Sequence, residues 1–348
     1  MLLFSAQNPY GTIRTAMKST EVQVLPAPPN LIKAILSGFD TIANHIGLII
    51  FPVALDVFLW LGPHLRVKGL LENAIQQITS LPGLVNPETA DMIQLSRDYW
   101  LVAAARVNLF TALRSYPVGI PSLMASRQPM VTPYGLPAFW EVSSLGAAVL
   151  IWILLFLVGL LLGTLFFIAV GHVTLGERLD WRLTFSTWPR AAGQVILLAL
   201  FWLAVLIAIS IPASCALTLA AFGGLGGSTL GILLYFGLVL WVMFPLVFSP
   251  LVILVDKRQM WPSVLHSVRL TRFTLPTTAL LFITLLFISE GLDFLWSVPA
   301  ESSWITLHAL AGHAFIVTSL LATCFIYYRD ANRWMQRVIQ QAQLSSIA

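Results

Sequence analysis

Charged residues are scarce in this chain. Asp, Glu, Lys and Arg make up 10% of its 348 residues, whereas 58% are apolar, and the mean hydropathy is +0.85. A soluble globular domain carries about 25% charged residues, because its surface has to be hydrated. The apolar residues also occur in runs of about 20–30, the length that crosses a bilayer. This composition excludes secreted, nucleic-acid-binding and ordinary cytosolic-enzyme classes and predicts a multi-pass membrane protein.

Cysteine is almost absent as well. The two cysteines, Cys215 and Cys324, both lie within apolar runs. Their positions exclude a disulfide framework and a CxxC metal site. Residues 1–30 lack the short apolar run and cleavage site of a signal peptide, so we interpret them as a flexible lead-in.

The long apolar runs predict an all-α, polytopic helical membrane protein with about six transmembrane helices, kinked spans and an extracytoplasmic helical cap. Apolar residues at helical spacing in 31–44 predict an amphipathic helix at the membrane surface. Pro212 in the third span and Pro245 and Pro250 in the fourth predict kinks, because proline cannot donate the helical hydrogen bond. The predicted spans are His45–Gly62, Ser143–Val173, Ala191–Phe222, Thr229–Val255, Leu275–Phe294 and Trp304–Tyr328.

This reading divides the chain into five segments. The cap is expected to contain short helices at Val67–Ile78 and Glu88–Arg97 and an interfacial helix at Trp100–Ser115, with prolines breaking regular structure from there to Trp140. The segments are a lead-in (1–30), an amphipathic helix with the first span (31–62), the cap (63–142), a five-span bundle (143–328) and a cytoplasmic tail (329–348).

Basic residues in the short connections orient the spans. They precede the first span, lie between the second and third and between the fourth and fifth, and follow the sixth. The other two short connections have no Lys or Arg. Cytoplasmic loops carry the excess of Lys and Arg, whereas long loops such as 63–142 cross regardless of charge. We therefore expect a cell-membrane protein with both termini in the cytoplasm.

A weak internal repeat accompanies this pattern. Arg178 and Arg258, and likewise Trp181 and Trp261, stand eighty positions apart, each pair just after an apolar run. Repeats of this kind are common among transporters. Duplication and chance both remain open as explanations.

The segment from Phe244 to Ile288 carries a recognisable order of features. A proline-kinked span is followed by an acid-basic turn at Asp256-Lys257, then Trp261, a Ser267-Val-Arg269-Leu helix and another span. This order resembles the membrane domain found beside bacterial glycerophosphoryl diester phosphodiesterases, and related multi-pass bacterial proteins of unknown function. The resemblance covers the C-terminal half and implies a helical membrane module. The hydrolase of that family is a separate TIM barrel, which needs about 250 residues, so the resemblance implies no catalytic residue here.

Ionisable side chains inside the spans are candidates for a functional site, because burying them unpaired is costly. The candidates are Asp56 in the first span, Glu290 and Asp293 in the fifth, and His308 and His313 in the sixth. All lie toward the outer ends of their spans and could contribute to one polar site for a proton or cation. The interpretation we favour is that Glu290, Asp293 and His308 are interfacial and Asp56 bonds a neighbouring helix. His308 and His313 are five positions apart, which does not suit a zinc pair, and we expect no metal and no cofactor.

Basic residues on the predicted cytoplasmic face form a second candidate site. A rim of this kind attracts anionic lipid headgroups, although topology alone also explains basic residues on this side. The rim residues are Arg178, Arg182, Lys257, Arg258, Arg269 and Arg272.

Together these features favour a non-enzymatic bacterial membrane protein with a scaffolding or envelope-lipid-associated role. The alternative is an ion-coupled or small-molecule transporter that uses the kinked spans and Asp56. An intramembrane enzyme is a third and weaker hypothesis. The expected partners are membrane lipids and other membrane subunits, with no nucleic acid.

Overall fold

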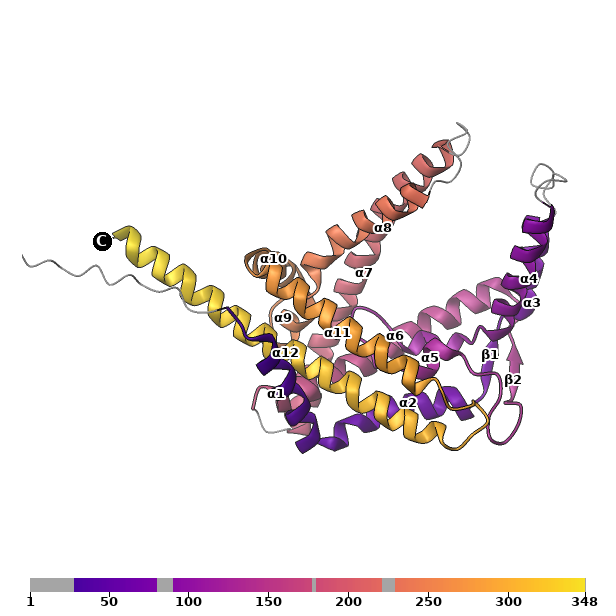
Figure 1. The fold of residues 1–348 in the computed structure, drawn as a ribbon, viewed down its shortest axis with the longest axis horizontal. Coiled ribbons are helices and arrows are strands. Elements are labelled where there is room, and N and C mark those ends of the chain that lie inside the picture. The colour runs from indigo at the N-terminus through magenta and orange to yellow at the C-terminus, as the bar shows by residue number, and fades with distance from the viewer. Residues whose placement is uncertain (1–27, 80–89, 177–179, 221–228, 348) are drawn as a thin grey trace, which may run out of the picture.

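The computed structural model describes residues 28–79, 90–176, 180–220 and 229–347, and nearly all of them are helical (Figure 1). Five helical segments are long and apolar enough to cross a membrane, and the number is six if a pair of helices bent by 90° is counted as one span. The all-α, multi-pass class predicted from the sequence is therefore confirmed. The five segments are α6 (Leu145–Thr174), α7 (Trp181–Ala220), the broken span α8–η4–α9 (Thr229–Met243, Phe244–Leu246, Ser249–Val255), α11 (Leu275–Trp296) and α12 (Thr306–Ile347).

The bent pair consists of α1 (Leu31–Asn44) and the continuous η1–α2 segment (Ile46–Ile49, Ile50–Leu61). The Asn30 side chain accepts a hydrogen bond from the Lys33 backbone N–H at 3.0 Å and so caps the start of α1. Gly38 lets α1 approach α12 closely: a Cβ atom there would lie 2.8 Å from the Ser319 carbonyl oxygen. The predicted amphipathic helix is thus present, and its buried face packs on α12.

The fourth span is broken at the predicted prolines. Between α8 and α9 the backbone leaves the α-helical pattern, and the Ser267 hydroxyl on α10 (Met260–Phe273) fills the gap. This hydroxyl donates to the Pro245 carbonyl oxygen at 2.8 Å and accepts from the Phe248 N–H at 3.1 Å. Backbone groups freed by a helix break inside a membrane have to be satisfied by protein. Ser267 therefore stabilises the break.

The cap begins and ends in a two-stranded parallel sheet. Strand β1 (His64–Arg66) pairs with β2 (Phe139–Glu141), with His64 opposite Phe139. The cap helices are α3 (Lys68–Thr79), α4 (Ala90–Arg106), the 3₁₀ turn η2 (Leu109–Leu113) and α5 (Leu123–Arg127). The sheet joins the two ends of the cap segment and closes it as a loop.

The prediction of an interfacial helix at Trp100–Ser115 is wrong. Helix α4 ends at Arg106, and the Asn108 side chain caps the next turn instead. Its carbonyl oxygen accepts hydrogen bonds from the Phe110 N–H at 3.1 Å and from the Leu65 N–H at 3.0 Å. Asn108 thus caps the turn that follows α4 and also bonds to the backbone of strand β1.

Residues 109–125 of the cap enter the bundle beside α6. A Cβ on Gly159 would lie 2.4 Å from the Leu113 carbonyl oxygen, and one on Gly163 would lie 2.6 Å from the Gly119 Cα. Val118 and Met124 are 0% and 1% exposed. Irregular backbone at membrane depth is tolerated where protein buries it. The two glycines of α6 therefore accommodate the cap within this chain.

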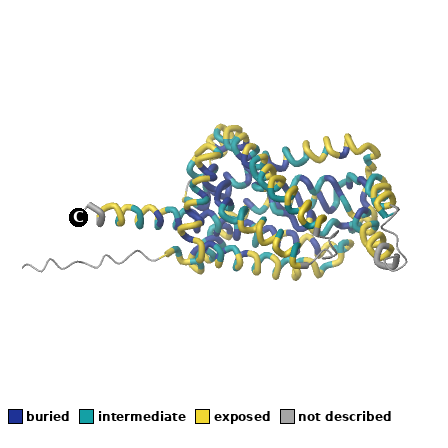
Figure 2. The backbone as a smooth tube through the Cα atoms, turned by 90° about the horizontal axis from the view of Figure 1, so that it is seen from above, coloured by how far each residue is buried: buried dark blue, intermediate teal, exposed yellow. Residues whose placement is uncertain are grey.

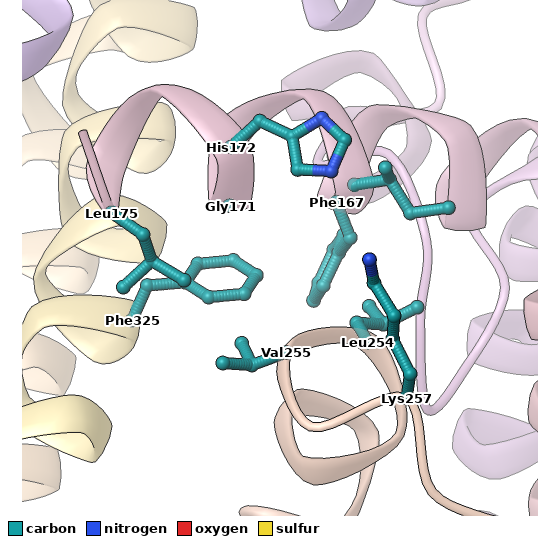
Figure 3. A pocket seen from close by; sticks show the side chains of 9 residues that line it. Phe167, Gly171, His172, Leu175, Leu254, Val255, Lys257 and Phe325 are labelled. Atoms are coloured by element: carbon teal, nitrogen blue, oxygen red, sulfur yellow. The ribbon is translucent and has the colours of Figure 1, made fainter. Parts of the chain in front are cut away.

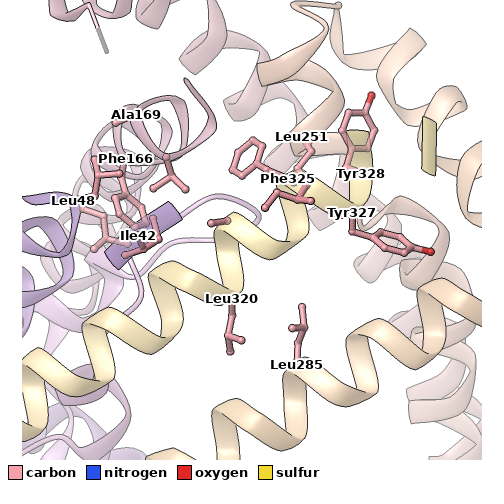
Figure 4. Close-up of a cluster of buried hydrophobic side chains, with 14 of the residues drawn as sticks. Ile42, Leu48, Phe166, Ala169, Leu251, Leu285, Leu320, Phe325, Tyr327 and Tyr328 are labelled. Carbon is pink, nitrogen blue, oxygen red and sulfur yellow. The ribbon is translucent and has the colours of Figure 1, made fainter. Parts of the chain in front are cut away.

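Helix α12 is central to the core. Its side chains Phe325, Tyr327 and Tyr328 are almost fully buried, and they extend from α12 toward the residues of neighbouring helices in Figure 4. The Tyr327 hydroxyl lies 2.8 Å from the Thr277 hydroxyl on α11. Figure 2 shows the buried residues concentrated in the body and the C-terminal part of α12 extending out of it.

Helices α7 and α8 extend away from this body as a pair (Figure 1). In the most apolar stretch of α7 only 17% of the residues are buried, against 61% in that of α12. Exposed side chains on these helices are mostly aliphatic or aromatic. Such a surface is suited to lipid.

Candidate functional site

Two ends of the bundle carry polar side chains. The cap end is where the cap meets the α11–α12 connection: the Met130 N–H donates to the Glu301 side chain at 2.9 Å, and Arg127 donates to the Pro299 carbonyl oxygen at 3.1 Å. The basic end is where the N-terminal part of α7 meets the α9–α10 turn, and there the Met260 N–H donates to the Gln194 side chain at 2.7 Å. The predicted intramembrane site lies at the cap end and the predicted basic rim at the other.

Asp56 on α2 is fully buried at the cap end. One of its carboxylate oxygens, Oδ1, accepts a hydrogen bond from the Ser122 hydroxyl at 2.6 Å and another from the Met124 N–H at 2.9 Å. The Ser122 oxygen in turn accepts from the Ala125 N–H at 3.0 Å and caps α5. The carboxylate therefore holds the start of α5, which is part of the cap segment that enters the bundle.

His313 on α12 lies between Asp56 and Asp293. Its Nδ1 is 3.7 Å from Asp56 Oδ2, and its Nε2 is 3.5 Å from Asp293 Oδ1. Side-chain exposure rises along this series, from 0% for Asp56 to 4% for His313 and 29% for Asp293. Three of the five predicted residues thus meet, and they come from three different helices.

The other two predicted residues lie apart from this cluster. Glu290 on α11 is exposed and reaches Asp293 only through electrostatic repulsion. His308 is exposed, because five positions on a helix turn it away from the face that carries His313. Sequence reasoning missed Ser122, Met124 and Arg114. The guanidinium of Arg114 acts electrostatically on Asp56, Asp293 and His313.

A cavity of about 260 Å³ opens at the basic end between α6, the start of α7 and the α9–α10 turn. Three cationic side chains line it: Arg190, Lys257 and Arg258. His172 and Gln194 contribute further polar groups, and Ile168, Ile253 and Leu254 contribute an apolar wall. The lining thus combines three cationic side chains with an apolar wall.

Lys257 and His172 also line a second, smaller space next to this cavity (Figure 3). There Phe167, Val255 and Phe325 surround a volume of about 20 Å³, which holds about one water molecule. In Figure 3 the Lys257 ammonium extends from the α9–α10 turn toward the His172 ring on α6. Lys257 therefore stands between the two spaces.

The charges of the cavity are poorly balanced. Within the described ranges, Arg258 is the one of the three cations with an ion pair, to Asp256 at 3.5 Å. Asp256 also accepts a hydrogen bond from the Tyr328 hydroxyl at 3.0 Å. Lys257 has a backbone φ of +53°, a conformation that is uncommon outside glycine and costs about 1 kcal/mol. Strain of this kind often accompanies a functional position.

Only some of the predicted rim residues line the cavity. Lys257 and Arg258 line it, whereas Arg182, Arg269 and Arg272 are exposed elsewhere on α7 and α10. Arg178 lies outside the described residues. Arg190, His172 and Gln194 were missed, because their contribution depends on how α6, α7 and the α9–α10 turn come together. The aromatic residues Trp181 and Trp261 are 42% and 55% exposed near this end, as expected at a membrane–water interface.

Neither site resembles a metal centre. Among the described residues no group of three or more His, Cys, Asp or Glu side chains is arranged to hold a metal ion. The chain matches no family model, no curated protein and no solved structure. What can be stated of its class is that it is a multi-pass helical membrane protein with five to six candidate spans.

Proposed function

We propose that this chain is a non-enzymatic membrane protein that binds the headgroup of an anionic phospholipid in the cavity at its basic end. The observation that carries the proposal is that Arg190 and Lys257 line the cavity without an acidic partner in the described part of the chain. Arg and Lys recognise phosphate through charge-assisted hydrogen bonds, which are about twice as strong as neutral ones. The apolar wall and the nearby exposed tryptophans favour a lipid over a free anion.

The test is thermal unfolding of the purified full-length chain in a neutral detergent. Phosphatidylglycerol is expected to raise the unfolding midpoint, because a ligand that binds the folded state stabilises it. Phosphatidylcholine and inorganic phosphate are expected to leave the midpoint unchanged. The double substitution Arg190→Gln and Lys257→Gln should abolish the response.

A matched control removes the same charge elsewhere. Arg333 and Arg337 on α12 are both exposed and do not line the cavity. The double substitution Arg333→Gln and Arg337→Gln should leave the response to phosphatidylglycerol intact. An equal loss in both double variants would show that net charge is responsible and contradict the proposal. If inorganic phosphate shifts the unfolding midpoint as much as phosphatidylglycerol does, the ligand is a soluble anion and not a lipid.

The orientation that accompanies this proposal has both termini in the cytoplasm of a cell membrane. It is supported by the basic residues at the α6–α7 and α9–α10 turns and by the position of the cap with the α11–α12 connection at the other end. Reporters inserted at residues 223–227 and at the C terminus should give signals on opposite sides. Signals on the same side would contradict the orientation.

The resemblance to the membrane domain of glycerophosphoryl diester phosphodiesterases stays a prediction. It is compatible with a module that meets phospholipid headgroups without hydrolysing them. Phosphodiesterase activity in the purified chain would contradict the non-enzymatic part of the proposal. Other membrane subunits are the further predicted partners, and the exposed faces of α7 and α8 are the surfaces they would cover.

Ion-coupled transport is the second candidate function, and the cluster of Asp56, His313 and Asp293 favours it. The substitution Asp56→Asn separates the two. Lost ion-coupled flux with unchanged thermal stability would favour transport, whereas loss of folding without any flux in the wild type would oppose it.

A further inference from the structure

The His313 ring occupies an unusual position at the cap end, because each of its nitrogens faces a carboxylate on a different helix. Asp293 Oδ1 lies 3.5 Å from Nε2, and Asp56 Oδ2 lies 3.7 Å from Nδ1. The three groups lead from a side chain that is 29% exposed to one that is 0% exposed. A single imidazole thus separates an accessible acid from an inaccessible one.

The contact between His313 and Asp56 is incomplete. Asp56 Oδ2 and His313 Nδ1 are both buried, and neither has a hydrogen-bond partner among the described residues. Leaving a buried polar group without a partner costs about 1–3 kcal/mol. Both contacts of the ring exceed the usual hydrogen-bond length of about 2.7–3.2 Å. A movement of less than about 1 Å therefore lets the ring bond one carboxylate or the other.

Proton counting limits the states of this cluster. A neutral imidazole has one N–H donor and one acceptor nitrogen. When Nδ1 carries the hydrogen it donates to Asp56, and Nε2 then accepts from a protonated Asp293. When Nε2 carries the hydrogen it donates to Asp293, and Nδ1 accepts from a protonated Asp56. The two states contain the same number of protons and have the same total charge.

We propose that His313 passes a proton between Asp293 and Asp56, so that the cap end contains a proton-exchange site. In the inward step the Asp293 O–H bond breaks as the Nε2–H bond forms, and the Nδ1–H bond breaks as the O–H bond of Asp56 forms. The outward step is the reverse. Since the ring ends in the other tautomer, the cluster stores one proton on Asp56 and returns it by the same route.

Two neighbouring charged side chains also act on the cluster. Arg114 acts on all three groups as a cation, and Glu290 acts on Asp293 as an anion. Asp56 also holds Ser122 and the Met124 N–H through its other oxygen. A neutral carboxyl accepts weaker hydrogen bonds than a carboxylate. Protonation of Asp56 therefore loosens its hold on α5. This inference does not depend on the lipid site.

The test follows the buried carboxyl by infrared spectroscopy. The full-length chain, in bilayers of phosphatidylcholine, is brought from about pH 8 to about pH 5, a range that spans His titration. A carboxyl C=O band that appears on acidification and is absent in Asp56→Asn is assigned to Asp56. On transfer to D₂O this band should shift rapidly in the wild type and at least about tenfold more slowly in His313→Gln, because the step through the ring is lost.

One control matches the histidine variant. His308→Gln removes an exposed histidine from the same helix. It should exchange the Asp56 proton at the wild-type rate, whereas Asp293→Asn should slow it. An unchanged rate in His313→Gln would overturn the proposal, since the proton then takes another route. Absence of any Asp56 band would also overturn it, because Asp56 would then be a permanently charged anchor.

A measurement on the wild type covers the case in which His313→Gln does not fold. Nitrogen NMR of the ¹⁵N-histidine-labelled chain reports which ring nitrogen carries hydrogen. A buried histidine that exchanges between its two tautomers in the pH range where the Asp56 band appears supports the relay. A single fixed tautomer across that range would contradict it. Neither outcome depends on phosphatidylglycerol, so failure here leaves the lipid site untouched.

Discussion

The two polar ends of this protein use charge in opposite ways. At the cap end, the carboxylate of Asp56 is fully buried and bonded to Ser122 and to the backbone of Met124. At the basic end, Arg190 and Lys257 line an open cavity, and neither has an ion pair within the described residues. The charge at the cap end makes contacts within the chain, whereas the charges at the basic end are available to bind an external ligand.

Packing differs in the same way between the cap side and the α7–α8 pair. Gly159 and Gly163 bring α6 into contact with the backbone of the cap. Gly193 on α7 and Gly237 on α8 have no atoms within 4 Å of the position of an added Cβ. Small residues in membrane helices permit close backbone approach, and α6 uses such an approach at Gly159 and Gly163 whereas α7 and α8 do not at Gly193 and Gly237. The following variants test this contrast.

The largest effect is expected for Gly163→Ala. The new Cβ would lie 2.6 Å from the Gly119 Cα and 2.9 Å from the Val118 carbonyl oxygen, so backbone has to move. Overpacking of this kind costs about 1–3 kcal/mol, and we expect the upper end. The free energy of unfolding in mixed micelles measures it. Gly237→Ala is the matched control and should be neutral or slightly stabilising, because alanine favours a helix. Equal changes in the free energy of unfolding in the two variants would contradict the proposed difference in packing.

A smaller loss is expected for Ser122→Ala. The substitution removes the hydroxyl that donates to Asp56 at 2.6 Å and the cap of α5. Loss of one partner of a buried charged group costs about 1–3 kcal/mol, and here we expect about 2. Ser214→Ala, at an exposed site on α7, should cost little. If Ser122→Ala unfolds at the wild-type midpoint, the carboxylate does not anchor the cap.

At the basic end a substitution is expected to stabilise the protein. Lys257 has a left-handed backbone conformation with φ of +53°, which glycine adopts without a steric penalty. Lys257→Gly should raise the free energy of unfolding by about 0.5–1 kcal/mol in the absence of lipid. The same variant should respond less to phosphatidylglycerol than the wild type. A gain in stability together with an undiminished response to phosphatidylglycerol would show that Lys257 does not contribute to lipid binding.

The smallest effect concerns pH at the cap. Burial lowers the pKa of His64, which lies outside the spans, below its ordinary value of 6.5. The unfolded chain therefore binds a proton near pH 6.5 that the folded chain does not, and the contribution of His64 to stability is lost as the pH falls below that value. The unfolding midpoint of His64→Gln should fall less than that of the wild type between about pH 7.5 and 5.5. Parallel curves would exclude His64 as a cause of acid sensitivity.

The fold class and the positions of five spans could be read from the sequence, because scarce charge and long apolar runs act over many residues. Convergence of Asp56, Asp293 and His313 could be expected from their similar depth in their spans. The burial of cap residues 109–125 could not be predicted, because irregular backbone has no periodicity and its burial depends on two glycines of α6. Ser267 could not be assigned to the broken span either, because its bonds to Pro245 and Phe248 need the tertiary fold.

The cavity at the basic end was the least accessible to sequence reasoning. Lys257 and Arg258 were found as part of a charge pattern, whereas Arg190 and Gln194 line the cavity only because the start of α7 packs on the α9–α10 turn. Arg269 and Arg272 share the same pattern and stay exposed on α10. A count of basic residues therefore identifies the side of the membrane but not the residues of the site.

Native mass spectrometry of the full-length chain released from bilayers tests the central claim most directly. The bilayers contain phosphatidylglycerol and phosphatidylcholine in equal amounts. The account predicts that the wild type and the Arg333→Gln, Arg337→Gln control retain phosphatidylglycerol, while the Arg190→Gln, Lys257→Gln variant retains it on the order of tenfold less. Equal retention of phosphatidylglycerol by all three proteins would contradict the account.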